Sequence, residues 1–408
     1  MTHFRPSIAI RMTSYQNPAF SFCNFAFAAL AIPLSLAAGP LEIDDKGVFS
    51  EESIEEQWAS FGHVIKDGEN PLLQDLWFLG RHHLHHHNTD GSVDNDAGWE
   101  HRRTRFGFQA EMLDHLTVHA QAVSGSDFEP VYNGFTELWL RWEFSDLVNL
   151  SVGQQKHRFT HDRNVSSRYM NYMERSMFIN MMGLDYTPAV TFSGKSGDFN
   201  YYTGVFSNAT GPDMGEAFTE FDSGWSFLYA GTWDVGSHIS TDTAHFTASY
   251  LHSDANANAT NLNRYDDGIA AALILTEGPT SLVTEVTGGF GSSNGDGVSL
   301  NLQPGIYLTD KLQLVGRYQV AMSNDDAGLV AQRRYERPAG LPAGDFYQAV
   351  YVGLNYHLLG HRAKIMSGVE YSEMGGEQTV TAWAGYRMFF GPDSNAPFPA
   401  NAMLEGLW

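Results

Sequence analysis

The sequence has few long apolar runs, a single cysteine and few charged residues. No run of 18 apolar residues occurs after residue 40, which excludes membrane-spanning helices from the body of the chain. The only cysteine is Cys23, near the N-terminus, so the rest of the chain can form no disulfide. Charged residues make up 17% of the chain, against about 25% in an average soluble protein. A helical membrane protein and a disulfide scaffold are therefore both excluded.

Basic residues are scarcer than acidic ones. The chain has 24 Lys and Arg against 47 Asp and Glu, which gives a net charge of −23. So acidic a chain is not expected to bind nucleic acid.

Residues 1–38 are predicted to be a signal peptide. Arg5 and Arg11 precede a run of apolar and small residues, and the tripeptide "SLA" ending at Ala37 has the small-x-small form of a cleavage site. The alternative interpretation is a buried N-terminal helix. Removal of the leader takes away both arginines and no acidic residue, so the mature chain is more acidic still.

Residues 39–74 are predicted to form a short periplasmic segment. Ser50 precedes "EESIEEQW", and a helix starting there would place Ile54, Trp58 and Phe61 on one side.

From residue 75 to residue 390 the chain has the alternating pattern of β-strands. In "RRTRFGFQAEM", residues 102–112, Arg103 and Arg105 lie on one face of an extended strand, and Phe106 and Phe108 lie on the other. The same pattern predicts sixteen strands, at residues 76–87, 102–112, 115–123, 135–144, 148–156, 185–193, 198–206, 224–235, 242–252, 265–276, 280–290, 297–308, 311–321, 346–357, 361–371 and 379–390.

The connections between these strands sort by length. Short connections, such as "LD" at 113–114 and "TD" at 309–310, mostly follow even-numbered strands. Long connections mostly follow odd-numbered strands, at residues 88–101, 124–134, 157–184, 207–223, 253–264 and 322–345. Outer-membrane β-barrels have this arrangement, with short periplasmic turns and long outer loops. The fold class predicted is therefore an all-β transmembrane barrel of about sixteen antiparallel strands.

The faces of the strands agree with a barrel in lipid. Soluble barrels need a polar outer surface, and this chain has too few charged residues to make one. We therefore expect Phe106 and Phe108 to meet lipid, and Arg103 and Arg105 to line a wet lumen. Only the strand at 76–87 fits less well, because histidine and arginine occur on both of its faces.

The histidines of "HHLHHH", residues 82–87, have two interpretations. His83, His85 and His87 share a face with Arg81 and could in principle meet at a metal. Neighbours two apart on a strand are nearly 7 Å apart, however, which is too far for one zinc ion with bonds of about 2 Å. A pH-sensitive polar rim is the favoured interpretation, and no metal is expected.

One stretch resembles a known family. Residues 152–183, "VGQQKHRFTHDRNVSSRYMNYMERSMFINMMG", contain V-G-Q-x-K at 152–156, S-S-R-Y at 166–169 and M-E-R-S at 173–176. This stretch is similar to the phosphate-selective porin family of the O and P type. The resemblance implies a sixteen-stranded, trimeric outer-membrane channel whose third long loop folds into the barrel and narrows the pore. Residues 157–184 are the third and longest of the predicted loops, which suits that role.

The sequence also departs from the family. His157 and Arg158 stand where members often have Glu-Pro, and the long N-terminal segment of some members is missing or shortened. Phe389 and Phe390 fit the aromatic end of the last strand, yet residues 391–408 follow and are predicted to be a tail.

A channel needs a constriction whose charges set its selectivity, and rings of Arg and Lys favour anions. The candidate pore and anion-binding residues on the wall are Arg103, Arg105, Arg141, Arg317 and Arg387. Those on the third loop and its entry are Lys156, Arg158, Arg168 and Arg175.

The other interpretation is that the wall arginines pair with wall acids and select weakly. Candidate partners are Glu111, Glu143, Glu285 and Glu370. Glu174, next to Arg175, is predicted to hold the third loop by an ion pair.

The function predicted is passive diffusion of small anions, of the phosphate type, through a water-filled barrel in the outer membrane. The alternatives are a general porin with weak or no selectivity and, in another class, a barrel enzyme or adhesin. No catalytic residue and no cofactor are expected. The predicted partners are membrane lipid, small anionic solutes and two further copies of the chain.

Overall fold

The computed structural model describes residues 51–125, 128–261, 264–291 and 293–392. The predicted signal peptide and most of the predicted tail therefore lie outside the described residues. The chain before the barrel forms helix α2 (Glu51–Ser60) and strand β1 (His63–Lys66), and α2 begins at the residue after Ser50, as predicted.

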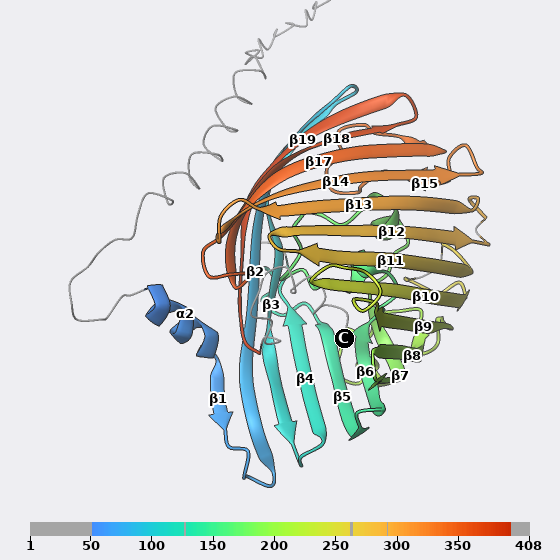
Figure 1. Ribbon diagram of the computed structural model, residues 1–408. Coiled ribbons are helices and arrows are strands. Elements are labelled where there is room, and N and C mark those ends of the chain that lie inside the picture. Colours follow the sequence, from blue (N-terminus) through green and yellow to red (C-terminus); the bar gives the residue numbers. More distant parts are fainter. Residues whose placement is uncertain (1–50, 126–127, 262–263, 292, 393–408) are drawn as a thin grey trace, which may run out of the picture. The chain divides into compact units, whose positions relative to one another are not determined.

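Sixteen strands form one closed antiparallel ring, which confirms the predicted fold class (Figure 1). Each strand pairs with its neighbours along the chain, and the last strand pairs with the first, from Phe390 opposite Gly80 to Thr379 opposite Gly91. The strands of the ring are β2 (Leu73–Gly91), β3 (Asn95–Met112), β4 (Leu116–Val123), β5 (Phe135–Ser145), β6 (Val148–Lys156), β7 (Tyr186–Ser196), β8 (Phe199–Ser207), β9 (Gly224–Asp234), β10 (Thr243–Ala255), β11 (Asp267–Glu277), β12 (Thr280–Phe290), β13 (Gly297–Tyr307), β14 (Leu312–Ser323), β17 (Phe346–His357), β18 (Ala363–Met374) and β19 (Glu377–Phe390).

Apolar side chains cover the outside of this ring. Phe106 and Phe108 of β3 are 40% and 39% exposed, as expected for residues that face lipid. On β12, Val286 is 52% exposed, whereas the preceding Glu285 is 1% exposed. Successive residues therefore face lipid and lumen in turn.

One predicted long loop is wrong. Residues 88–101 were expected to connect two strands, but β2 continues to Gly91 and β3 starts at Asn95, which leaves a turn of residues 92–94. The polar letters "NTDGSVDND" are typical of a loop, and here they extend a hairpin. A strand that pairs on both sides needs no apolar face, so hydrophobic alternation could not reveal this extension.

The segment before the ring contacts the end of the last strand. The indole Nε1 of Trp58 donates to the carbonyl oxygen of Phe389 at 2.9 Å, and the rings of Phe61 and Phe390 lie 4.9 Å apart. Strand β1 pairs with the start of β2, with His63 opposite Trp77. In the described part of the chain, no helix is long and apolar enough to cross a membrane.

The lipid-facing assignment predicts the effect of a charge on the outer face. Val286→Arg should lower the free energy of unfolding by about 2–4 kcal/mol, the usual cost of an arginine near the bilayer midplane of a barrel. Val286→Leu is the matched control and should leave it nearly unchanged. Urea unfolding in lipid vesicles measures both variants, and equal stability of the arginine variant and the native chain would contradict the assignment.

Candidate pore site

The β6–β7 loop, residues 157–185, contacts lumen-facing side chains of the wall. It contains the short helices α3 (His161–Asn164) and α4 (Met177–Met181), and most of its side chains are buried. The guanidinium of Arg387 on β19 donates to four of its carbonyl oxygens, at distances of 2.8–3.3 Å; these belong to Ser167, Met170, Tyr172 and Met173. Irregular backbone needs such donors when it is removed from water.

Further wall residues bind the backbone of this loop, among them Lys364, Arg317 and Glu285. Lys364 on β18 donates from Nζ to the carbonyl of Met170 at 2.7 Å. Arg317 on β14 donates to the carbonyl of Glu174 at 2.7 Å. On β12, the carboxylate of Glu285 accepts the backbone N–H of His161, at 2.5 Å, and so satisfies a free amide at the start of α3.

A β-bulge between β2 and β3 lets Arg102 form an ion pair with Glu174 of the β6–β7 loop. The pairing of β2 with β3 shifts register between His83 and Leu84, so that Arg102 has no partner of its own on β2. The guanidinium of Arg102 donates to both carboxylate oxygens of Glu174, at 2.5 and 3.1 Å. Glu174 thus forms its ion pair with Arg102 and not with the adjacent Arg175.

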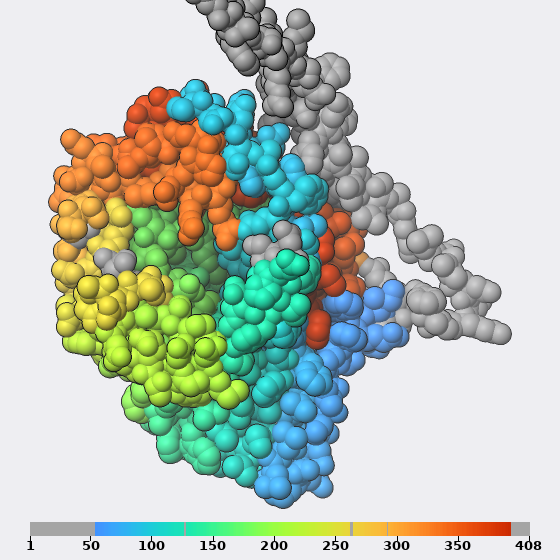
Figure 2. Space-filling view, turned by 180° about the vertical axis from the view of Figure 1, so that it is seen from behind, coloured from blue at the N-terminus to red at the C-terminus, as the bar shows by residue number. Residues whose placement is uncertain are grey.

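A second loop contacts the first. The β14–β17 loop, residues 324–345, contains the short strands β15 (Leu329–Val330) and β16 (Ala343–Gly344). Gln332 donates from Nε2 to the carbonyl of Arg175 at 2.8 Å, and the hydroxyl of Tyr335 donates to Glu370 of β18 at 2.7 Å. In Figure 2, green atoms of the middle of the chain are visible in a hollow between the cyan, orange and yellow parts.

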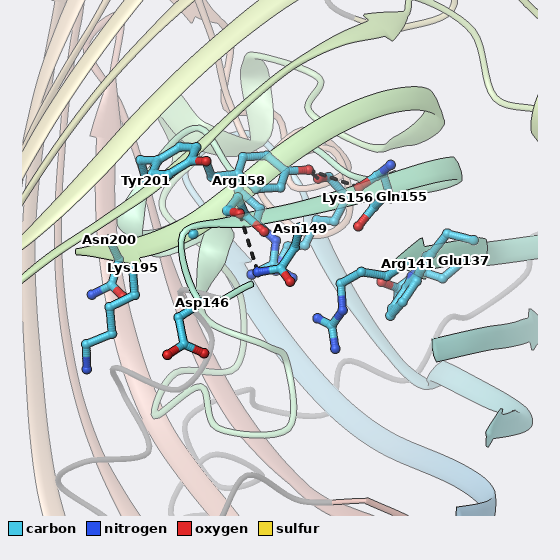
Figure 3. A pocket seen from close by; sticks show the side chains of 15 residues that line it. Glu137, Arg141, Asp146, Asn149, Gln155, Lys156, Arg158, Lys195, Asn200 and Tyr201 are labelled. Carbon is cyan, nitrogen blue, oxygen red and sulfur yellow. Dashed lines mark hydrogen bonds between the residues drawn. The ribbon is translucent and has the colours of Figure 1, made fainter. Parts of the chain in front are cut away.

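A cavity of about 350 Å³ remains beside strands β5 to β8. Its cationic lining residues are Arg141, Lys156, Arg158 and Lys195, and its acidic ones are Glu137 and Asp146. Figure 3 shows how these side chains gather around the open space from neighbouring strands and turns. Cations therefore outnumber acids in this cavity although the chain as a whole is strongly acidic.

Further cations surround Tyr186, at the start of β7. The guanidinium of Arg105 donates to the Tyr186 hydroxyl at 3.0 Å, and its carbon lies 5.0 Å from the ring centre. The guanidinium carbon of Arg163 lies 5.3 Å from the same ring. Arg103 is partly exposed two residues before Arg105.

The predicted pore residues other than Arg168 thus fall into two groups. Arg141, Lys156 and Arg158 line the cavity. Arg105 on β3 bonds to Tyr186, and Arg103 lies two residues before it on the same strand. Arg317, Arg387 and Arg175 are buried: Arg317 pairs with Glu370 at 2.7 Å, and Arg175 donates to the carbonyl of Val165. Arg168 lies over the ring of Phe389, at 5.0 Å, and donates to the carbonyl of Pro392.

Some site residues were not predicted from the sequence. Lys195 lies near the end of β7, in the stretch "GKSG", which indicated only a strand connection in the sequence. Arg102 was given no role from the sequence, because regular alternation would put it on the same face as Phe106 and Phe108, and only the register of the bulge reverses this. Of the proposed wall partners, Glu370 and Glu143 do bind arginines, Arg317 and Arg141 respectively.

The histidines of β2 do not gather around a metal. His83 and His85 are buried on the lumen side, with ring centres 6.2 Å apart, and His87 bonds to Asp96 at 2.7 Å. Among the described residues, no three His, Cys, Asp or Glu side chains come close enough to hold a metal ion.

The sequence matches a family of known proteins. The sequence model for phosphate-selective porins O and P matches residues 81–287, just over half of the chain. The chain belongs to this family. It is an outer-membrane porin, a channel and not an enzyme. No curated protein sequence matches the porin significantly.

Solved structures share the fold of the porin at low identity. OprB of Pseudomonas putida has a TM-score of 0.56 and 11% identity, and the match covers 77% of this chain and 94% of OprB. OmpF of Salmonella typhi, solved with daunomycin, has a TM-score of 0.53 and 11% identity, over 80% of this chain and all of OmpF. The outer membrane channel DcaP of Acinetobacter baumannii has a TM-score of 0.50 and 13% identity, over 78% of this chain and 97% of DcaP.

The Arg102–Glu174 pair makes the loop contacts pH-dependent. Burial alone would raise the pKa of Glu174, but the guanidinium of Arg102 outweighs burial and lowers this pKa to about 2. A carboxyl whose folded pKa lies below its unfolded value stabilises the fold at higher pH, and this contribution is lost as pH falls from about 4.5 towards 2. We expect protease resistance of the loop to decrease over that interval.

Glu174→Gln should reduce loop stability at neutral pH by about 3 kcal/mol, because it leaves Arg102 buried without a counter-charge. It should also remove most of the acid sensitivity. The double variant Arg102→Met with Glu174→Leu is the control and should cost less than the two single changes added together. Strict additivity, or an acid response that persists in Glu174→Gln, would contradict the assigned pair.

Proposed function

We propose that this porin is a passive diffusion channel for small anions, with phosphate-type solutes as their class. The observation that carries the proposal is the charge of the cavity: Arg141, Lys156, Arg158 and Lys195 face two acids there. An ion responds to charges within a Debye length, about 8–10 Å, and not to the net charge of the whole surface. Arginine and lysine donors also suit phosphate oxygens.

The β6–β7 loop has a different part in this proposal. We infer that it lies inside the barrel and narrows the pore, and its contacts with β12, β14, β18 and β19 support this placement. Arg317, Arg387 and Arg175 then hold the loop, while Lys156, Arg158, Arg141, Arg103 and Arg105 set selectivity. Lys156 also donates to the carbonyl of Asn164 in the loop, at 2.7 Å. Arg168 lies on the loop near the end of β19.

Charge reversal in the cavity tests the proposal. The native channel should prefer Cl⁻ over K⁺ in a salt gradient across a planar bilayer. Lys156→Glu and Arg158→Glu should each shift the reversal potential towards K⁺ and together abolish the anion preference. Lys66→Glu is the matched control, since Lys66 is exposed on β1 outside the ring and its reversal changes net charge equally.

A native channel that already prefers K⁺ would contradict the proposal and favour a general porin. An equal shift from Lys66→Glu would show that the effect is one of overall charge and not of the cavity.

We further propose that the porin is exported by a signal peptide at residues 1–38 and assembles as a homotrimer. The outer face of β2 and β3 supports an interface: His82 and Thr104 point outward and bond to each other at 2.9 Å, and His86 packs against Trp99 at 4.8 Å. Polar side chains are costly against lipid, so this part of the ring suits contact with protein. Outward residues elsewhere, such as Phe246 on β10, are apolar and exposed.

Photo-crosslinking tests the interface. A photoreactive amino acid at His86 should form covalent dimers and trimers in the outer membrane. The same amino acid at Phe246, eight strands away in the ring of sixteen, is the control and should react with lipid alone. Equal yields of crosslinked chains at both positions, or none at His86, would contradict an interface at β2 and β3.

A further inference from the structure

An indole side chain, that of Trp139, lines the cavity beside β5 to β8, on the side of the sheet expected to face water. Trp139 on β5 pairs with His119 of β4, and both rings are on the lumen side of the sheet. Trp139 is only partly buried and lines the cavity together with Arg141 and Arg158. An indole gains nothing from contact with water, so its position on the lumen side calls for an explanation.

Two other large aromatic side chains on the lumen side are covered by the loops. Trp383 of β19 is 5% exposed, and its ring lies 4.6 Å from that of Tyr335 in the β14–β17 loop. Tyr351 of β17 is 1% exposed and lies 5.5 Å from Tyr172 of the β6–β7 loop. These rings serve to pack the loops, whereas Trp139 faces the cavity.

The neighbours of Trp139 leave part of its ring accessible. His119 stacks on it from the β4 side, with ring centres 4.9 Å apart and planes at 11°. The residue opposite Trp139 on β6 is Gly153, whose φ of +119° is rarely adopted by residues with a side chain. Gly153 has no side chain, so it does not cover the indole on the β6 side.

Cations stand next to this ring. The guanidinium carbon of Arg141, two residues along β5, lies 5.6 Å from the Trp139 ring centre. The guanidinium carbon of Arg158 lies 5.4 Å from the ring of Tyr202, which also lines the cavity. The cavity thus presents flat apolar surface and forked donors for an anion within one space of about 350 Å³, a size common for sites that bind small organic molecules.

We propose that this cavity is a binding site for aromatic carboxylates on their way through the pore. The carboxylate would accept hydrogen bonds from Arg141 or Arg158, and the ring of the solute would pack against the indole of Trp139. Inorganic phosphate and chloride have no apolar surface and would gain nothing from Trp139. This inference rests on the proposed anion channel and names a class of solute that it would retain.

Current blockade measures this binding directly. Benzoate is added to the porin in a planar bilayer with KCl, and the concentration that halves the chloride current is determined. Acetate supplies the carboxylate without the ring, and benzamide supplies the ring without the charge. Benzoate should halve the current at a concentration about tenfold below either control compound.

Substitutions on β5 distinguish the effect of the Trp139 indole on blockade from a general effect on the fold. Trp139→Leu should raise the half-blocking benzoate concentration about fivefold to tenfold and leave the acetate value unchanged. Trp139→Phe retains a ring and should restore most of the native value. Trp142→Leu is the matched control, because Trp142 lies on the same strand but faces outward, with 37% exposed, and it should leave blockade unchanged.

The outcomes distinguish the two proposals. If benzoate and acetate block alike in the native porin, or if Trp139→Leu blocks like the native porin, the aromatic site is overturned even where the reversal potential still shows anion preference. If the native porin prefers K⁺, the anion channel itself fails. Blockade by benzamide as strong as by benzoate would also overturn the site, since the cations would then have no part in it.

Discussion

The structure depends on hydrogen bonds from side chains of the barrel wall to the irregular backbone of the β6–β7 loop. The β6–β7 loop is mostly irregular and buried, so its carbonyl oxygens without a partner in the loop need donors from elsewhere. Arg387 supplies several of them from one planar guanidinium. Arg317 and Lys364 add one each, and Glu285 accepts the amides at the start of α3.

This requirement engages some of the lumen-facing cations, while others line the cavity. Arg387 and Arg317 are nearly fully buried and bind the loop, so their charge is committed to carbonyls and to Glu370. The cations that line the cavity, such as Arg141 and Arg158, lie against aromatic rings and remain near open space. A chain that is acidic as a whole can in this way have a cavity lined by more cations than acids.

Much of the ring could be predicted from the sequence because strand alternation depends on local residues alone. The faces of β3 and β12 followed from a period of two, and the sixteen strands all occur near their predicted positions. The extension of β2 to Gly91 was missed because its polar residues show no apolar face.

The site was harder to predict, because its partners lie far apart in the chain. Nothing local distinguishes Arg317, which binds Glu370 and a loop carbonyl, from Arg141 at the cavity. The role of Arg102 depends on a register shift between β2 and β3, and that of Tyr335 depends on a loop that reaches Glu370 of β18.

The placement of the β6–β7 loop is the central claim, and labelling of a single cysteine tests it most directly. In a chain with Cys23→Ser, Ser167→Cys would place the thiol where Ser167 is 4% exposed and accepts a hydrogen bond from Arg81 at 2.9 Å. Asp326→Cys, at an exposed position of the β14–β17 loop, is the rim control. The account predicts that a bulky, membrane-impermeant maleimide added to intact cells labels position 326 at least tenfold faster than position 167. Equal rates at the two positions would contradict it.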